Sequence, residues 1–226
     1  MEGKPQDYGV GLATQAEMLR AASKFDAKLS DQPIRDKYAR FTLTRTADLV
    51  GACALFVEPA HIVAGHVLMR SMLEDLIKIL WATISESNAE KLCNASIDHL
   101  KNIMRANNEG GTARITDKQG KDHSARFLKS DRLAPSGKKK SVEAMARDVG
   151  AVGIYDMFYR FASIQTHGNA VGPTTPNTAA DVLVVLSGVG AVAKATGHTA
   201  IRWLLGRERP SNKDLVELLG VWRSRT

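Results

Sequence analysis

Apolar residues recur along most of the chain at intervals of three and four, which is the period of an amphipathic α-helix. Strand-like alternation of apolar and polar residues is nearly absent. We predict helices over residues 11–30, 34–57, 60–86, 88–106, 140–149, 151–169, 178–205 and 211–223. Prolines support these boundaries, since Pro33 begins the second helix, Pro59 separates it from the third and Pro210 opens the last. The pattern predicts an all-α fold, an antiparallel helical bundle.

A long polar segment at residues 107–138 interrupts this pattern, and it is rich in turn formers such as Asn107–Gly111. The whole net charge of +7 falls between Lys101 and Lys140, where eleven Lys and Arg residues face four Asp and Glu. A structureless loop of this length is unusual inside a compact domain. We therefore predict one helical domain over residues 1–226, with a mobile basic insertion at 107–138.

The segment from Tyr155 to His167 separates into two chemically different faces if it forms a regular α-helix at about 100° per residue. The apolar face consists of Ile154, Met157, Phe158, Phe161 and Ile164, and the polar face of Asp156, Tyr159, Arg160, Ser163 and His167. A solvated helix face is usually built from Lys and Glu. This polar face instead combines groups that transfer protons or bind anions.

A second polar stripe lies in the predicted helix 60–86, where His66, Arg70 and Glu74 recur at intervals of four and so share a face. Arg70 and Glu74 are placed to form an ion pair within the helix. One interpretation is a weak pair on the surface. The other is a partly buried pair in which Glu74 orients Arg70 or an imidazole from another helix, and the apolar flanks of the stripe favour it.

These two stripes carry a resemblance to known families. The sequence R-S-M-L-E-D at Arg70–Asp75, followed by Y-R-F-A-S-I-Q-T-H at Tyr159–His167, resembles the paired R-x-x-x-E and Y-x-x-x-S-x-x-x-H motifs of a bacterial family known only as a domain of unknown function. More loosely, Arg160 and His167 resemble the arginine and histidine of the HEPN superfamily motif. HEPN proteins are all-α bundles, and many are metal-independent RNases of toxin–antitoxin and phage-defence systems with a site shared across a dimer.

The resemblance implies that His167 and Arg160 are the catalytic pair and that Tyr159, Ser163, Arg70 and Glu74 are supporting residues. The chemistry is suitable, because histidine exchanges protons near neutral pH and the planar guanidinium of arginine pairs with phosphate oxygens. Arg160 and His167 are seven positions apart, so the two side chains lie about 10.5 Å apart along a helix axis. One phosphate contacts both if Arg160 bends toward His167 or if a two-fold dimer joins two stripes.

The basic insertion is suited to a phosphate backbone. The residues predicted to bind RNA are Lys121, Arg126, Lys129, Arg132, Lys138, Lys139 and Lys140. Phe127 is the one aromatic residue between positions 101 and 140, so the sequence gives little support for stacking on exposed bases.

Other classes of function have less support. His61 and His66 diverge on a helix and no carboxylate or cysteine completes a metal set, so we expect neither metal nor cofactor. Cys53 and Cys93 lie in apolar helical patterns, as reduced core residues of a cytoplasmic protein do. The N-terminus does not resemble a secretion signal. The most apolar run, Val182–Ala193, stops at Lys194, short of the ~20 residues that span a bilayer, so we expect no membrane contact.

Two hypotheses of function follow. The first is a HEPN-like RNA-directed protein, in its most specific form a metal-independent endoribonuclease of a bacterial defence or toxin system, which forms a homodimer and has an antitoxin or another protein as partner. The second is a non-catalytic helical interaction protein. In that case Tyr159, Ser163 and His167 form a hydrogen-bonded ladder against Arg70 and Glu74, and the basic insertion binds an acidic partner.

Overall fold

The computed structural model describes residues 4–25, 33–108, 114–129, 140–160, 163 and 177–220. Its helices are α1 (Pro5–Lys24), α2 (Pro33–Cys53), η1 (Pro59–His61), α3 (Ile62–Ala82), α4 (Glu86–Asn108), α5 (Ser124–Lys129), α6 (Val142–Asp148), α7 (Val152–Ile154), η2 (Tyr155–Tyr159), α9 (Ala179–Leu204) and α10 (Asn212–Leu218). The predicted all-α fold is confirmed, and among the described residues the one β-type pairing is an isolated bridge between Thr116 and Asp122.

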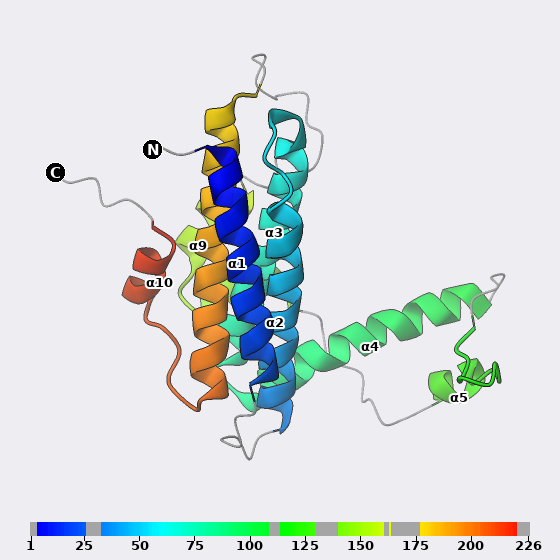
Figure 1. Cartoon of the computed structure of the whole chain (residues 1–226). Coiled ribbons are helices and arrows are strands. Elements are labelled where there is room, and N and C mark those ends of the chain that lie inside the picture. The colour runs from blue at the N-terminus through cyan, green and yellow to red at the C-terminus, as the bar shows by residue number, and fades with distance from the viewer. Residues whose placement is uncertain are drawn as a thin grey trace.

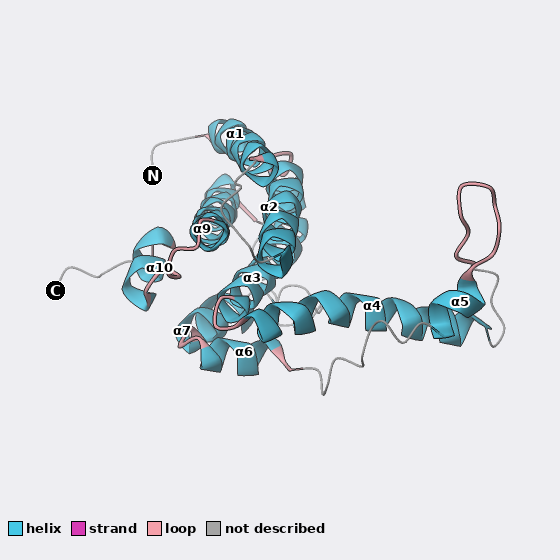
Figure 2. Ribbon diagram, turned by 90° about the horizontal axis from the view of Figure 1, so that it is seen from below, coloured by secondary structure: helices cyan, strands magenta, loops and turns pink. Residues whose placement is uncertain are grey.

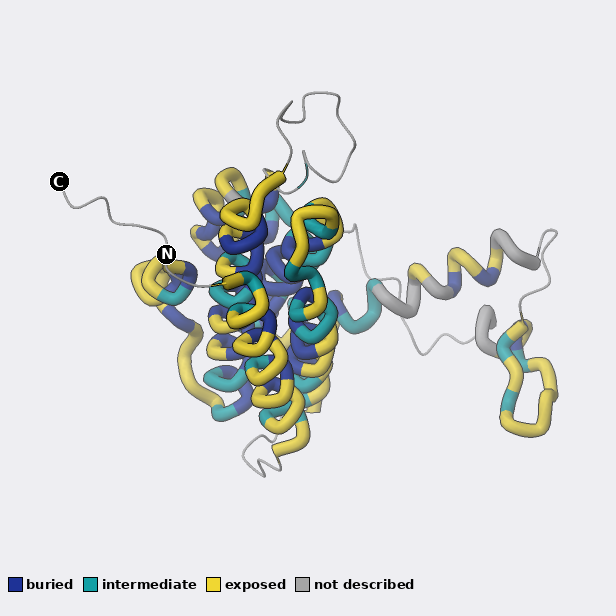
Figure 3. Tube along the Cα trace, turned by 45° about the horizontal axis from the view of Figure 1, so that its top comes forward, coloured by how far each residue is buried: buried dark blue, intermediate teal, exposed yellow. Residues whose placement is uncertain are grey.

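Four long helices, α1, α2, α3 and α9, pack side by side as a bundle (Figure 1). Their apolar positions face inward, and Figure 3 shows the buried residues along the inner sides of these helices. α2 runs opposite to α1 and α3, as predicted, whereas α9 begins at the same end of the bundle as α3 (Figure 1). The bundle is therefore not antiparallel throughout.

Small residues let α3 and α9 approach closely. A Cβ atom at Gly65 would lie 2.8 Å from Cγ1 of Val185, and one at Gly188 would lie 3.0 Å from the sulfur of Met69. Both contacts are tighter than ordinary van der Waals contact. The two helices are thus held together over several turns by glycine positions that a larger residue would force apart.

α9 agrees with the predicted helix 178–205, since it continues beyond Lys194, where the most apolar run stops, and ends at Leu204. Lys194 lies on the exposed side of the helix, while its neighbours Ala193 and Ala195 are buried. By length and composition alone α9 could cross a membrane, but half of its most apolar 18-residue window is buried inside the protein. The helix packs against α1, α2 and α3, as the core helix of a bundle does.

α4 starts beside α2 and α3 and then projects away from the bundle, carrying α5 near its far end (Figures 1 and 2). Residues 114–123 form a turn in which the Asp117 carboxylate lies 2.9 Å from Nε2 of His123 and accepts hydrogen bonds from two backbone amides. Part of the predicted insertion therefore has its own secondary structure. Residues 109–113 and 130–138 lie outside the described residues, and the mobility of the insertion stays a prediction.

α6 and η2 both pack against α3, and the short α7 joins them (Figure 2). The indole of Trp81, at the end of α3, donates a 2.7 Å hydrogen bond to Asp148 of α6. Lys140 also donates to this carboxylate, and its ammonium lies 5.8 Å from the Trp81 ring centroid. These contacts fix α6 on α3, and α7 and η2 follow it directly in the chain.

Candidate functional site

The helix predicted over residues 151–169 begins as α7 and then widens into a π-helix, η2, at Tyr155–Tyr159. In a π-helix the backbone hydrogen bonds join residues five apart instead of four, so the following side chains are displaced around the axis. Ile154 and Tyr159, five apart, are both buried, whereas Met157 is 61% exposed. The prediction that Met157 lies with the apolar side chains that face the core is therefore wrong, because it assumed a regular α-helix.

Arg70 of α3 and Tyr159 of η2 are in direct contact. Nη2 of Arg70 donates a 3.0 Å hydrogen bond to the Tyr159 hydroxyl, and the guanidinium carbon lies 5.0 Å from the centroid of the tyrosine ring. Nε of Arg70 is buried and has no hydrogen-bond partner among the described residues. The first residues of the two sequence motifs thus meet in the fold, although 89 positions separate them.

Tyr155 and Arg160 extend this contact. The Tyr155 ring stacks on the Tyr159 ring with centroids 4.9 Å apart and an interplanar angle of 19°. The guanidinium carbon of Arg160 lies 5.3 Å from the centroid of the Tyr155 ring. Arg70, Tyr159, Tyr155 and Arg160 therefore form a continuous arginine–tyrosine stack, with a cation at each end and two phenol rings between them. Burial and the negative charge of Glu143 raise the pKa of Tyr155, so this phenol is neutral at physiological pH.

Arg160 lies at the exposed end of the stack and faces two carboxylates. Its Nε donates a 2.7 Å hydrogen bond to Asp156, and its Nη2 lies 3.7 Å from an oxygen of Glu143, which also pairs with Arg147 at 2.6 Å. The Arg160 side chain is 57% exposed. Exposed ion pairs of this kind contribute only about 0.2–1 kcal/mol, so a phosphate can displace these carboxylates at small cost.

Glu74 and Ser163 bond differently from what the sequence suggested. The Glu74 carboxylate accepts a 2.6 Å hydrogen bond from Lys78, and the expected ion pair with Arg70 does not form, because the Arg70 guanidinium turns toward Tyr159. The Ser163 hydroxyl donates a 2.8 Å hydrogen bond to the backbone carbonyl of Tyr159, one turn earlier. His66, on the same stripe of α3, is buried, and burial lowers its pKa.

The remaining predicted site residues do not join this stack in the part of the chain that the structure describes. His167, Arg132, Lys138 and Lys139 lie outside the described residues, as does the side chain of Lys129. Lys121 and Arg126 are exposed on the part of the chain that α4 carries away from the bundle. The ammonium group of Lys140 is bonded to Asp148 near the bundle. In the described part of the chain no three His, Cys, Asp or Glu side chains group as a metal site would require.

Two residues of the site were missed at the level of sequence. Tyr155 was assigned to neither face, although its spacing of four from Tyr159 is the spacing at which helix side chains meet, and this signal could have identified it. Glu143 lies on a separate helix, and no sequence pattern linked it to Arg160.

Comparison of the chain with known proteins finds one family. A family model described as "Family of unknown function (DUF5677)" matches residues 36–174, which run from the first turn of α2 to beyond η2 and contain both motifs. No curated protein and no solved structure gives a significant match. The predicted membership in a family of unknown function is confirmed, whereas the HEPN resemblance stays a prediction. The match covers more than half of the chain, which therefore belongs to the DUF5677 family.

Proposed function

We propose that this protein is a HEPN-like, RNA-directed protein that cleaves RNA without a metal ion and acts in a bacterial defence or toxin system. The observation that carries the proposal is the arginine–tyrosine stack. Through it Arg70, which is partly buried, supports the segment that presents the exposed Arg160, and His167 follows seven positions later in the sequence. An exposed guanidinium on a rigid support is well suited to a phosphodiester.

In the proposed reaction the imidazole of His167 takes the proton from a ribose 2′-hydroxyl. The 2′ oxygen then bonds to phosphorus as the bond to the 5′ oxygen breaks, and the departing oxygen takes up the proton that the His167 imidazole has gained. The products are a 2′,3′-cyclic phosphate and a free 5′-hydroxyl. Arg160 pairs with the non-bridging oxygens and stabilises the negative charge that develops on them.

The other residues of the site have supporting roles in this proposal. Tyr159 fixes the helix register through Arg70, and Ser163 fastens the next turn to it. Glu74 accepts a hydrogen bond from Lys78 and so holds that ammonium group on the surface of α3. Lys121 and Arg126, both exposed, contact the RNA backbone away from the reacting phosphate, which makes binding weaker at high salt.

The proposal is tested with purified protein and labelled RNA in the presence of EDTA. We expect the wild type to cleave, His167→Ala to lose about 100-fold or more of the rate, and Arg160→Ala to lose about 100-fold. Arg207→Ala, an exposed arginine next to the end of α9, serves as the control and retains activity. Circular dichroism checks that each variant is folded, and mass spectrometry identifies the RNA ends.

The cellular counterpart is growth arrest on induction of the wild type but not of His167→Ala. An inert wild type in both assays, cleavage that EDTA abolishes, or full activity in the His167 variant contradicts the proposal.

A second candidate function rests on a different aspect of the same contacts. Arg70 is bonded to Tyr159, and Arg160 is bonded to Asp156, as in a polar ladder that only fixes helix register. We propose as the alternative a non-catalytic helical interaction protein. It predicts that wild-type protein leaves RNA intact, while the Arg70 and Tyr159 variants lose stability.

A further inference from the structure

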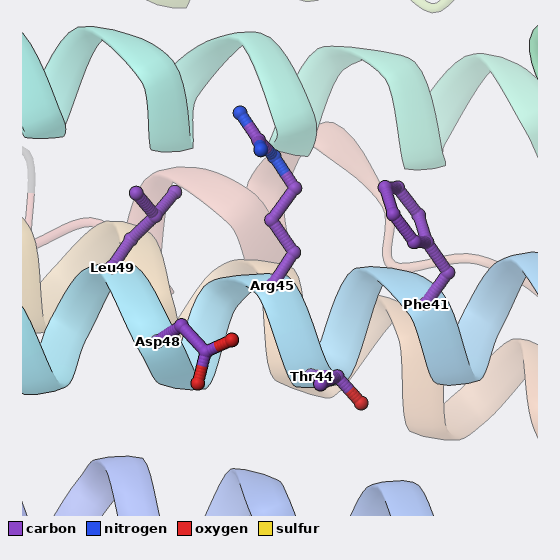
Figure 4. Close-up of a pocket in the computed structure, with 5 residues that line it drawn as sticks. All are labelled: Phe41, Thr44, Arg45, Asp48 and Leu49. Atoms are coloured by element: carbon purple, nitrogen blue, oxygen red, sulfur yellow. The ribbon is translucent and has the colours of Figure 1, made fainter. Parts of the chain in front are cut away.

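The outer face of α2 carries a groove that neither the motifs nor the family match explains. It is a pocket of about 270 Å³ lined by Phe41, Thr44, Arg45, Asp48 and Leu49 (Figure 4). The residues of α2 that pack into the bundle are Tyr38, Ala39, Thr42, Leu43, Thr46, Ala47, Val50 and Cys53. The groove residues occupy the complementary positions, where all but the half-buried Leu49 are exposed, so the groove opens away from the core.

The groove has the form of a helix-packing site. Phe41, Arg45 and Leu49 are spaced by four and form one ridge on the helix surface, and Thr44 and Asp48 form the neighbouring ridge. A groove between two such ridges accepts the corresponding ridge of another helix, at a crossing angle of about −50°. Phe41 is 54% exposed, although aromatic side chains are usually covered.

The charges on the two ridges indicate which helix fits. Arg45 and Asp48 are three residues apart and lie on opposite ridges. A two-fold axis that passes between them places Arg45 of each copy against the carboxylate on the other copy, so the surface is complementary to itself. Both side chains have capacity for a further partner. Arg45 bonds to Asp75 through Nε and stays 45% exposed, and Asp48 bonds to Arg20 through one oxygen and stays 65% exposed.

We propose that the outer face of α2 is the interface of a homodimer, in which the Phe41–Arg45–Leu49 ridge of each copy occupies the groove of the other. The inference is independent of RNA cleavage and goes beyond it. A stable interface needs about 800 Å² from each partner, which is more than one helix crossing provides. α4 supplies additional surface, since it leaves the bundle beside α2 and carries Ile103, which is 49% exposed (Figures 1 and 2).

The test is the mass of the full-length protein in solution, measured by light scattering and by analytical ultracentrifugation over a concentration series. We expect a wild-type dimer. Asp48→Arg brings a second guanidinium against Arg45 of the other copy, and Phe41→Ala removes the apolar residue that fills the groove. Each change is expected to raise the dissociation constant at least about tenfold, which is ~1.4 kcal/mol.

Glu217→Arg is the matched control, because it makes the same change of charge at an exposed position on α10, which lies on another side of the bundle (Figure 2). It is expected to remain dimeric. Phe41→Ala breaks no ion pair. If Asp48→Arg unfolds, the dissociation constant of the Phe41→Ala variant therefore tests the proposed interface. A monomeric wild type, including one that binds a different protein on this face, or a dimer that both changes leave intact, overturns the proposal.

Discussion

The hydrogen bond between Arg70 and Tyr159 gives the most direct test of the arginine–tyrosine stack. Tyr159→Phe removes only the hydroxyl that accepts the 3.0 Å bond, while the ring that contacts Arg70 and Tyr155 is kept. Hydrogen bonds to charged groups contribute about 1.5–3 kcal/mol. Arg70 is only partly buried, so water can replace part of the loss, and we expect a cost near the lower limit, about 1.5 kcal/mol. For a chain of this length this corresponds to a fall in Tm of about 3–6 °C.

The assay is urea unfolding followed by far-ultraviolet circular dichroism, arranged as a double-mutant cycle with Arg70→Met. We expect a coupling free energy of about 1–2 kcal/mol between positions 70 and 159. Tyr155→Phe is the control, because the Tyr155 hydroxyl forms no hydrogen bond with a described residue, and we expect a loss below about 0.5 kcal/mol. A coupling energy near zero refutes the inference that this bond joins α3 to η2.

Two further predictions concern packing and pH. Gly65→Ala is expected to lower the free energy of unfolding by about 1–3 kcal/mol in a thermal melt, because the new methyl group meets the β-branched Val185 at 2.8 Å. Gly153→Ala adds a methyl group that meets nothing within 4 Å, so we expect the melting temperature to stay unchanged or to rise slightly. Hydrogen bonds from Lys140 and from the Trp81 indole lower the pKa of Asp148. The ionised carboxylate therefore stabilises the fold at any pH above the ordinary carboxyl pKa. This stabilisation is lost as the pH falls through the lowered pKa. The stability difference between wild type and Asp148→Asn should therefore stay constant near neutral pH and shrink as the pH falls below the ordinary carboxyl pKa of 3.8, and a difference that stays constant there contradicts this account.

The helices of the bundle were predictable because each buries a stripe of apolar residues with a period near 3.6. Errors occurred where a local interaction overrides that period. α1 begins at Pro5, several residues before the predicted start, because proline suits the first turn of a helix and the Asp7 carboxylate accepts a hydrogen bond from the amide of Lys4. α5 was not predicted, since it is a short helix in a segment dominated by turn formers and charge.

The site was predictable only in part. The sequence analysis included the hypothesis that the two polar stripes face each other, and this hypothesis predicts the contact between Arg70 and Tyr159. The unusual polar groups of the two stripes were the signal for it. The competing bond from Lys78 to Glu74 has the same spacing of four as the expected pair, so spacing could not choose between them. The π-helix could not be foreseen, because the hydrophobic pattern does not distinguish it from an α-helix of the same composition.

The π-helix η2 explains why the two arginines of the stack differ in exposure. It directs Tyr159 inward to Arg70 on α3 and leaves the next residue, Arg160, directed to solvent with exposed carboxylates as its partners. A polar ladder that only fixes helix register does not need an exposed cation, because an exposed ion pair adds little stability. One cation is instead anchored while the other stays accessible. This asymmetry supports the proposed binding of a phosphate, since an anion site needs a rigid support and a charge that the ligand can reach.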